Sequence, residues 1–193
     1  MPDNVRVVGT WINNLASMAI LYLLVHIFIG DIGRMETYLQ NANHRFVAMV
    51  EGMFPASVAE RLLTEGGSFA QRHTDCSILF ADIVSFTHIA EKLGPQELVN
   101  LLTEVFRRFD QCVEQSGLTK IKTIGDAYMV AAGVPQPRAG HAVELVALAR
   151  NMMLAVRDIS GIQLRIGIAS GELVAGVIGQ SRQVFDVWGD VVN

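Results

Sequence analysis

The alternation of short apolar runs with helical stretches after residue 75 constrains this chain more than any other feature. Apolar runs of strand length cover residues 76–83, 118–125, 126–133, 162–170 and 172–179. The second and third runs meet at a Gly-Asp turn, which is typical of a hairpin. Helical patterns separate the other runs, over 86–116, with a break at Gly94-Pro95, and over 138–158. We therefore predict a compact α+β domain over residues 75–193.

The N-terminal part of the chain has a different pattern, a long apolar stretch without charges. Residues 15–29, LASMAILYLLVHIFI, contain no charged side chain, and the stretch extended back to Trp11 approaches the ~20 residues that cross a bilayer. We predict a transmembrane helix within residues 1–30, which contacts the membrane through residues 11–30. A buried helix of a soluble domain is the alternative. Arginines after the segment favour a cell-membrane protein whose C-terminal side lies in the cytoplasm.

Residues 31–74 are predicted to form a signalling helix or coiled coil followed by a linker. Apolar residues recur at alternating spacings of three and four, as in a heptad repeat: Ile32, Met35, Leu39, Ala42, Phe46, Met49 and Met53. This spacing favours a parallel dimeric helix, and a lone amphipathic helix lying on its own domain is the alternative. Pro55 interrupts the pattern, and Gly66-Gly67 marks a linker.

Charge and cysteine content exclude some classes of function. The formal net charge of −4 argues against a nucleic-acid binder, because such proteins are normally basic. The two cysteines, Cys76 and Cys112, lack metal-binding spacing, and we expect buried free thiols.

Two aspartates occupy positions that could bring carboxylates together. Asp82 ends an apolar strand and Asp126 lies in the hairpin turn. Taken singly, the first could be a helix N-cap and the second an ordinary turn residue. If the strand lies beside the hairpin, both carboxylates reach one sheet end and could hold a pair of Mg²⁺ ions for phosphoryl transfer. The backbone amides of the next residues, Ile83, Val84, Ser85 and Phe86, would then meet phosphate oxygens.

Four strings in order, LFADIVSFT, KTIGDAYMV, RIGIASGELVAGVIG and FDVWGDVVN, resemble the class III nucleotidyl cyclase catalytic domain. The resemblance covers about residues 75–193. The whole arrangement, with a long membrane and signalling helix ahead of the domain, is most similar to mycobacterial membrane-anchored adenylate cyclases. It implies a ferredoxin-like βαββαβ fold that works as a head-to-tail homodimer and converts ATP to cyclic AMP and pyrophosphate.

The same resemblance implies roles for individual residues. Asp82 and Asp126, with Ile83, would bind two Mg²⁺ or Mn²⁺ ions. Lys122 and Asp186 would recognise adenine, since a donor and an acceptor complement the ring nitrogen N1 and the amino group N6. Asn193 would orient the ribose at the reacting centre. Phe185 and Trp188 are expected in the core beneath the base, and stacking on adenine is the alternative.

One departure from the family pattern concerns the C-terminus. The family's transition-state arginine lies four positions beyond the asparagine that matches Asn193, where this chain ends. We therefore expect a catalytic domain that is incomplete at its C-terminus, which puts the activity of this length of chain in question. A catalytically inactive cyclase-like dimerisation or sensor module and a guanylate cyclase are the alternative functions.

Overall fold

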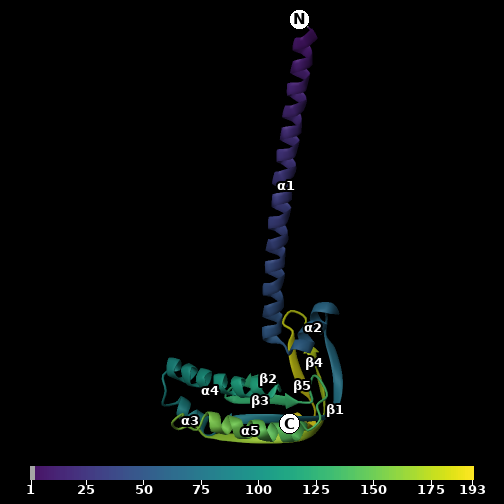
Figure 1. Ribbon diagram of the computed structural model, residues 1–193. Helices are drawn as coiled ribbons and strands as arrows, with labels where there is room; N and C mark the ends of the chain where they lie inside the picture. Colours follow the sequence, from purple (N-terminus) through teal and green to yellow (C-terminus); the bar gives the residue numbers. More distant parts are fainter. Residues whose placement is uncertain (1–2) are drawn as a thin grey trace. The chain divides into compact units, whose positions relative to one another are not determined.

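The computed structural model describes the backbone of residues 3–193, and side chains except at positions 3–10, 12–14, 16, 17, 19, 20, 27 and 51. The chain divides into two compact units, one up to Gly52 and one from Met53 onward, and each is described by itself. The first consists of a single continuous helix, α1, which covers Asp3–Met53 (Figure 1). Pro55 follows the end of this helix, as its lack of an N–H donor and its ring geometry require.

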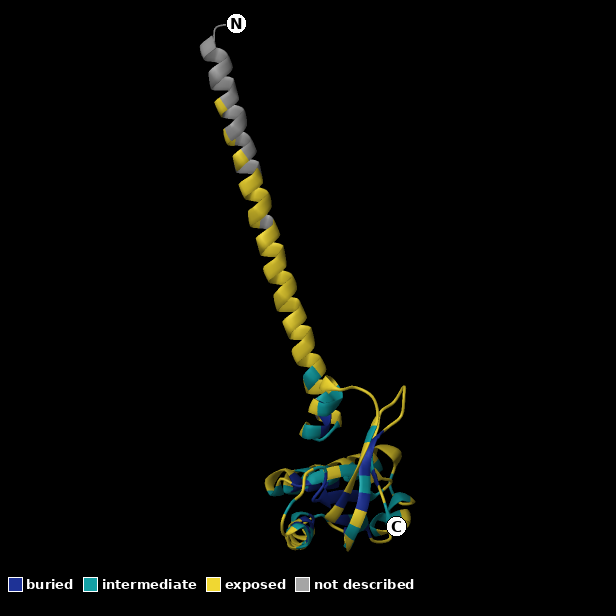
Figure 2. Cartoon of the chain, turned by 90° about the vertical axis from the view of Figure 1, so that its right-hand side faces the viewer, coloured by how far each residue is buried: buried dark blue, intermediate teal, exposed yellow. Residues whose placement is uncertain are grey.

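Helix α1 exposes the apolar side of its heptad. Ile32, Met35 and Leu39 are more than half exposed, as are Phe46 and Met49, and exposed residues follow one another along the helix in Figure 2. Among the residues whose side chains are described, no helix is long and apolar enough to cross a membrane. The predicted span over residues 11–30 is therefore not supported, and several of its positions lie outside the described side chains.

The second unit is built on a five-stranded antiparallel sheet with the order β2-β3-β1-β4-β5. Its strands are β1 (Phe69–Ile83), β2 (Thr119–Ile124), β3 (Ala127–Ala132), β4 (Leu164–Ile178) and β5 (Val184–Trp188). Its helices are α2 (Ala56–Thr64), α3 (Phe86–Ala90), α4 (Pro95–Ser116) and α5 (His141–Ala155), with a 3₁₀ turn at Asp190–Val192. Strands β1 to β4 with α4 and α5 form the predicted ferredoxin-like βαββαβ arrangement, and β5 extends the sheet beyond β4.

Strands β1 and β4 are longer than the sequence predicted. Residues 162–170 and 172–179 were expected as two strands, but β4 runs unbroken through Gly171, which lies opposite Cys76 of β1. The β1–β4 register shifts between His73 and Cys76, and such irregularities increase the local twist and bend of a strand. The sheet thus continues past this point instead of ending there. Strand β3 pairs with β1 on one side of the shift, and β5 pairs with β4 on the other.

Both faces of the sheet carry an apolar cluster. Alternate residues of β1, such as Leu79 and Ala81, pack with α4 and α5 on one face, which we call the helix face. Ile78 and its neighbours pack on the other, the open face, with α2 and β5. Phe185 belongs to the open-face cluster and is 5% exposed, as predicted, but Trp188 is 41% exposed and the prediction for it was wrong. The strand alternation that buries Phe185 and Val187 turns Trp188 outward.

Candidate active site

Two carboxylates meet where β1 ends beside the β2–β3 turn. Asp82 continues the open-face series of Ile78 and Phe80 along β1. Asp126 follows Gly125, whose φ of +63° lets the turn close. Burial raises the pKa of the Asp126 carboxyl, and the neighbouring Asp82 carboxyl raises it further, whereas hydrogen bonds with backbone groups lower it. The structure therefore brings together the two aspartates that the sequence suggested.

A cation already lies against this pair. Arg165 of β4 is the register partner of Asp82, and its Nη2 lies 2.5 Å from the Asp82 Oδ2. The arginine side chain is 78% exposed and that of Asp82 is 29% exposed, so the ion pair sits at the edge of solvent. Asp82, which lies beside Asp126, is thus already paired with a positive side chain.

The donor chemistry at this sheet end suits a divalent cation. Asp82 and Asp126 supply hard oxygen ligands with mutual repulsion that a cation would relieve. The Ile83 side chain has no ligating atom and packs in the helix-face cluster, so only the backbone carbonyl of Ile83 could serve as a ligand. Among the described residues, no cluster of three or more histidine, cysteine or acidic side chains could hold a metal. Any ion held here therefore keeps coordination positions for water or substrate oxygens, which Mg²⁺ commonly does.

The loop after β1 offers fewer free amides than the sequence suggested. The Val84 N–H donates to the Gln163 carbonyl at 2.8 Å, so this amide is engaged. Ser85 adopts a left-handed conformation with φ 58°, and its carbonyl accepts from the N–H groups of His88 and Ile89 at the start of α3. Phe86 packs against the helix-face cluster. Ser85 and Phe86 therefore stay as the predicted phosphate-facing amides of this loop.

The predicted adenine-reading residues form an ion pair. Lys122 Nζ donates to Asp186 Oδ2 at 2.6 Å, and the two side chains are 36% and 18% exposed. They come from β2 and β5, which lie at opposite edges of the sheet, so this contact requires the strong curvature of the long strands. The Val187 N–H donates to the other carboxylate oxygen, Oδ1, at 2.9 Å. Both oxygens of Asp186 are thus oriented before any ligand arrives.

A bulge in β2 determines which way Lys122 points. Lys120 pairs with Val130 and Lys122 pairs with Met129, so Ile121 is an extra residue in the ladder. In a regular strand the two lysines would share one face. Here Ile121 and Lys122 both turn to the open face, while Lys120 stays on the helix face.

The other lysine of β2, Lys120, belongs to a hydrogen-bond network that sequence reasoning missed. Lys120 Nζ donates to Asp110 Oδ1 of α4 at 2.6 Å, and the hydroxyl of the fully buried Tyr128 donates to the same oxygen. Burial, with the Asp110 carboxylate beside it, raises the pKa of Tyr128 far above its usual value. The sequence signal for this network is weak: a tyrosine in an apolar strand, Tyr128, and an acidic residue, Asp110, in the helix that precedes the hairpin.

Asn193 follows the 3₁₀ turn Asp190–Val192, and its backbone N–H donates to the Asp190 carbonyl at 3.3 Å. The side chain is exposed. Its predicted role at the ribose stays a prediction.

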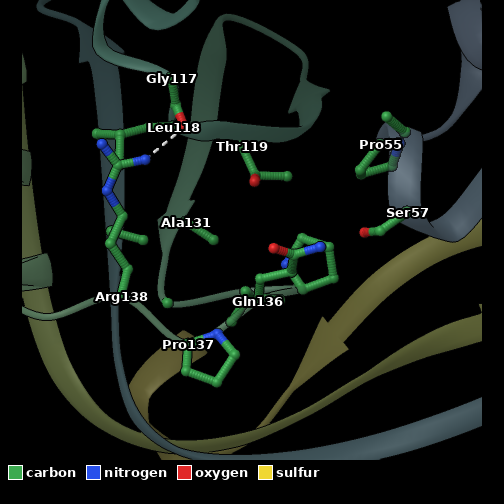
Figure 3. A pocket seen from close by; sticks show the side chains of 14 residues that line it. Pro55, Ser57, Gly117, Leu118, Thr119, Ala131, Gln136, Pro137 and Arg138 are labelled. Carbon is green, nitrogen blue, oxygen red and sulfur yellow. Dashed lines mark hydrogen bonds between the residues drawn. The ribbon is translucent and has the colours of Figure 1, made fainter.

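A separate cavity of about 410 Å³ lies between the start of α2 and the loop that follows β3. Figure 3 shows Ser57, Thr119 and Gln136 around it, with Arg138 at its side. Arg138 donates to the Gly117 carbonyl at 2.7 Å and to the Ser116 carbonyl at 3.0 Å, so its guanidinium fixes the α4–β2 turn. None of the predicted site residues lines this cavity.

Comparisons with known proteins find relatives that share this domain. The family model described as adenylate and guanylate cyclase catalytic domain matches residues 69–193. An adenylate cyclase of Mycobacterium tuberculosis is 42% identical over 171 residues, which cover 86% of this chain and 39% of that relative. The chain thus spans about two-fifths of the length of this curated relative.

Solved structures show the same fold. The catalytic core of a rhodopsin-guanylyl cyclase with converted specificity, in complex with ATPαS, has a TM-score of 0.61 and 30% identity, with 67% of this chain and 71% of that chain covered. A guanylyl cyclase domain from Blastocladiella emersonii, described as a non-canonical dimer, has a TM-score of 0.60 and 28% identity, with 65% and 72% covered. The chain therefore belongs to the adenylate and guanylate cyclase catalytic domain family, the class III nucleotidyl cyclases that its motifs resemble.

Proposed function

We propose that this protein is an adenylate cyclase that converts ATP to 3′,5′-cyclic AMP and pyrophosphate. The observation that carries the proposal is the Lys122–Asp186 pair at 2.6 Å. Adenine presents an acceptor at N1 and a donor at N6, and guanine presents the reverse at this edge. An ammonium has three protons and a carboxylate has four acceptor sites, so each partner keeps capacity for the base while the pair holds both in place.

The carboxylate end of the site would position the reacting phosphate. Asp82 and Asp126, with the Ile83 carbonyl, would hold two Mg²⁺ or Mn²⁺ ions. Bound there, such ions activate a hydroxyl and neutralise developing charge in phosphoryl transfer. The ribose 3′-oxygen forms a bond to the α-phosphorus, the bond from that phosphorus to the pyrophosphate oxygen breaks, and the hydroxyl proton is released. Ser85 and Phe86 amides would face the phosphate chain, and Asn193 would orient the ribose.

We propose that two copies share each active site in a head-to-tail homodimer. The family relative from Blastocladiella emersonii is described as a non-canonical dimer, which supports association of two copies, while the head-to-tail arrangement rests on the family resemblance. The exposed heptad side of α1 would pair in parallel with the same helix of the second copy, because it offers an apolar stripe of more than half-exposed side chains. In this arrangement the carboxylates of one chain and the lysine–aspartate pair of the other act on one nucleotide.

Substrate competition tests the nucleotide assignment. Initial rates of cyclic AMP and cyclic GMP formation are measured for the full-length protein with the Mg²⁺ or Mn²⁺ complexes of ATP and GTP. A kcat/KM at least tenfold higher for ATP supports the proposal. A preference for GTP would make the protein a guanylate cyclase, the function named for the Blastocladiella emersonii relative. Nucleotide binding without turnover would favour an inactive sensor module.

Mixing of two inactive variants tests the shared site. Asp126→Asn removes a carboxylate and Lys122→Ala removes a base contact, and each alone should lose most activity. A head-to-tail dimer that carries one of each retains one intact site, so mixing them should restore a quarter to a half of wild-type activity. Absence of any recovery, with dimers present by light scattering, would contradict the sharing of sites between copies.

A further inference from the structure

Arg165 is placed against the carboxylate pair by strand register alone. Asp82 and Arg165 lie directly opposite each other on β1 and β4, and opposite charges at such positions attract across the strands. The contact of 2.5 Å joins the arginine Nη2 to the Asp82 Oδ2. It therefore occupies an oxygen that a cation bound to Asp82 would use.

The surroundings of Arg165 leave its side chain free to move. The side chain is 78% exposed, and the next residue on the same face of β4 is Gly167, above which the space is open. An exposed ion pair of this kind is weak and screened by salt. A divalent cation that binds both carboxylates can therefore displace the guanidinium.

We propose that Arg165 is a placeholder cation for the metal site, which neutralises Asp82 while no metal is bound and yields that oxygen when a divalent cation arrives. This inference rests on the proposed function, because it takes Asp82 and Asp126 to be metal ligands. Asp126 lies against Asp82, so the arginine lowers the repulsion between two adjacent acids in the metal-free protein. Arg165 should therefore lower the affinity of the carboxylate pair for a metal ion, since the ion must displace the guanidinium and bind beside its positive charge.

The same two strands provide a matched control. Arg72 of β1 and Glu172 of β4 form another ion pair, at 3.2 Å, with side chains 67% and 63% exposed. Arg72 lies on the far side of the register shift from Asp82, and Glu172 lies within the shift. If Arg165 only joined the strands, Arg165→Gln and Arg72→Gln would have the same effects.

Metal binding without nucleotide tests the proposal. Binding of Mn²⁺ to the full-length protein is followed by the electron paramagnetic resonance signal of the free ion. Arg165→Gln should bind Mn²⁺ about 5- to 10-fold more tightly, from the loss of competition and of one positive charge near the ion. Arg165→Lys should lie near the wild type, and Arg72→Gln should stay within about twofold of it.

The outcomes separate this inference from the function on which it rests. Unchanged or weaker Mn²⁺ binding by Arg165→Gln, while Asp126→Asn loses binding, would overturn the placeholder role and leave the metal assignment intact. Unchanged Mn²⁺ binding by Asp126→Asn would overturn the metal site itself, and the role of Arg165 with it. Thermal unfolding of each variant identifies any change in affinity that comes from a loss of folding.

Discussion

Strand β2 carries two lysine–aspartate pairs of equal length that serve different parts of the molecule. Lys120 reaches Asp110 and Lys122 reaches Asp186, each at 2.6 Å. The first pair joins β2 to helix α4 on the helix face, and the second joins the two edge strands on the open face. Side-chain exposure of the lysines is similar, at 39% and 36%, so exposure does not distinguish them.

The other contacts of the two aspartates explain why the pairs have different roles. The Asp110 oxygen that accepts from Lys120 also accepts from the buried hydroxyl of Tyr128, so this carboxylate satisfies a core residue. Asp186 is held by Lys122 and by the Val187 backbone, and no core hydroxyl depends on it among the contacts described. Removal of Asp110 would leave the buried Tyr128 hydroxyl without its acceptor and so lower the stability of the fold. Removal of Lys122 or Asp186 would instead weaken the proposed binding of the base. The following substitutions test this distinction.

The largest effect is expected on catalysis. Lys122→Ala removes a charged donor to the base, and hydrogen bonds to charged groups contribute about 1.5–3 kcal/mol, so kcat/KM for ATP should fall about 10- to 100-fold. Lys120→Ala should change this value less than about threefold, because its pair lies on the helix face. Initial rates of cyclic AMP formation provide the measurement. Equal losses in the two variants would contradict the division of roles.

The next largest effect is expected on stability, where the Lys120–Asp110 pair should matter more than the Lys122–Asp186 pair. Asp110→Ala leaves the Tyr128 hydroxyl buried without its acceptor, which should lower the free energy of unfolding by about 1–3 kcal/mol. Asp186→Ala breaks a partly exposed pair and should lower it by less than about 1 kcal/mol. Denaturant titration of both variants gives the comparison. A control, Asp110→Ala combined with Tyr128→Phe, should recover part of the loss, since no hydroxyl is then stranded.

The sequence could predict features that depend on local pattern. The short apolar run before Asp82 indicated its strand, and the Gly-Asp turn located Asp126, because both signals lie within a few residues. The bulge at Ile121 could not be predicted, since an extra residue in a strand is defined only by its pairing partner on β3. The unbroken course of β4 through Gly171 depends likewise on its register with β1.

Engagement of backbone groups was also beyond sequence reasoning. The Val84 amide was predicted to face phosphate, yet it donates to the carbonyl of Gln163, which lies 79 residues further along the chain. Such a contact follows from where β1 and the segment before β4 meet. Motif resemblance suggested which residues belong to the site, but only the fold shows which of their atoms are already bonded.

The smallest effect is expected at Lys120 itself. Its ammonium lies 4.8 Å from the centre of the Tyr128 ring and pairs with a half-exposed carboxylate. Lys120→Met keeps much of the side-chain volume and removes both charge contacts, which should lower the free energy of unfolding by about 0.5–1.5 kcal/mol. The difference from wild type should shrink in 0.5–1 M salt, because salt screens exposed ion pairs. A loss as large as that of Asp110→Ala, or one that salt does not change, would show that Lys120 stabilises the core in another way than through its charge.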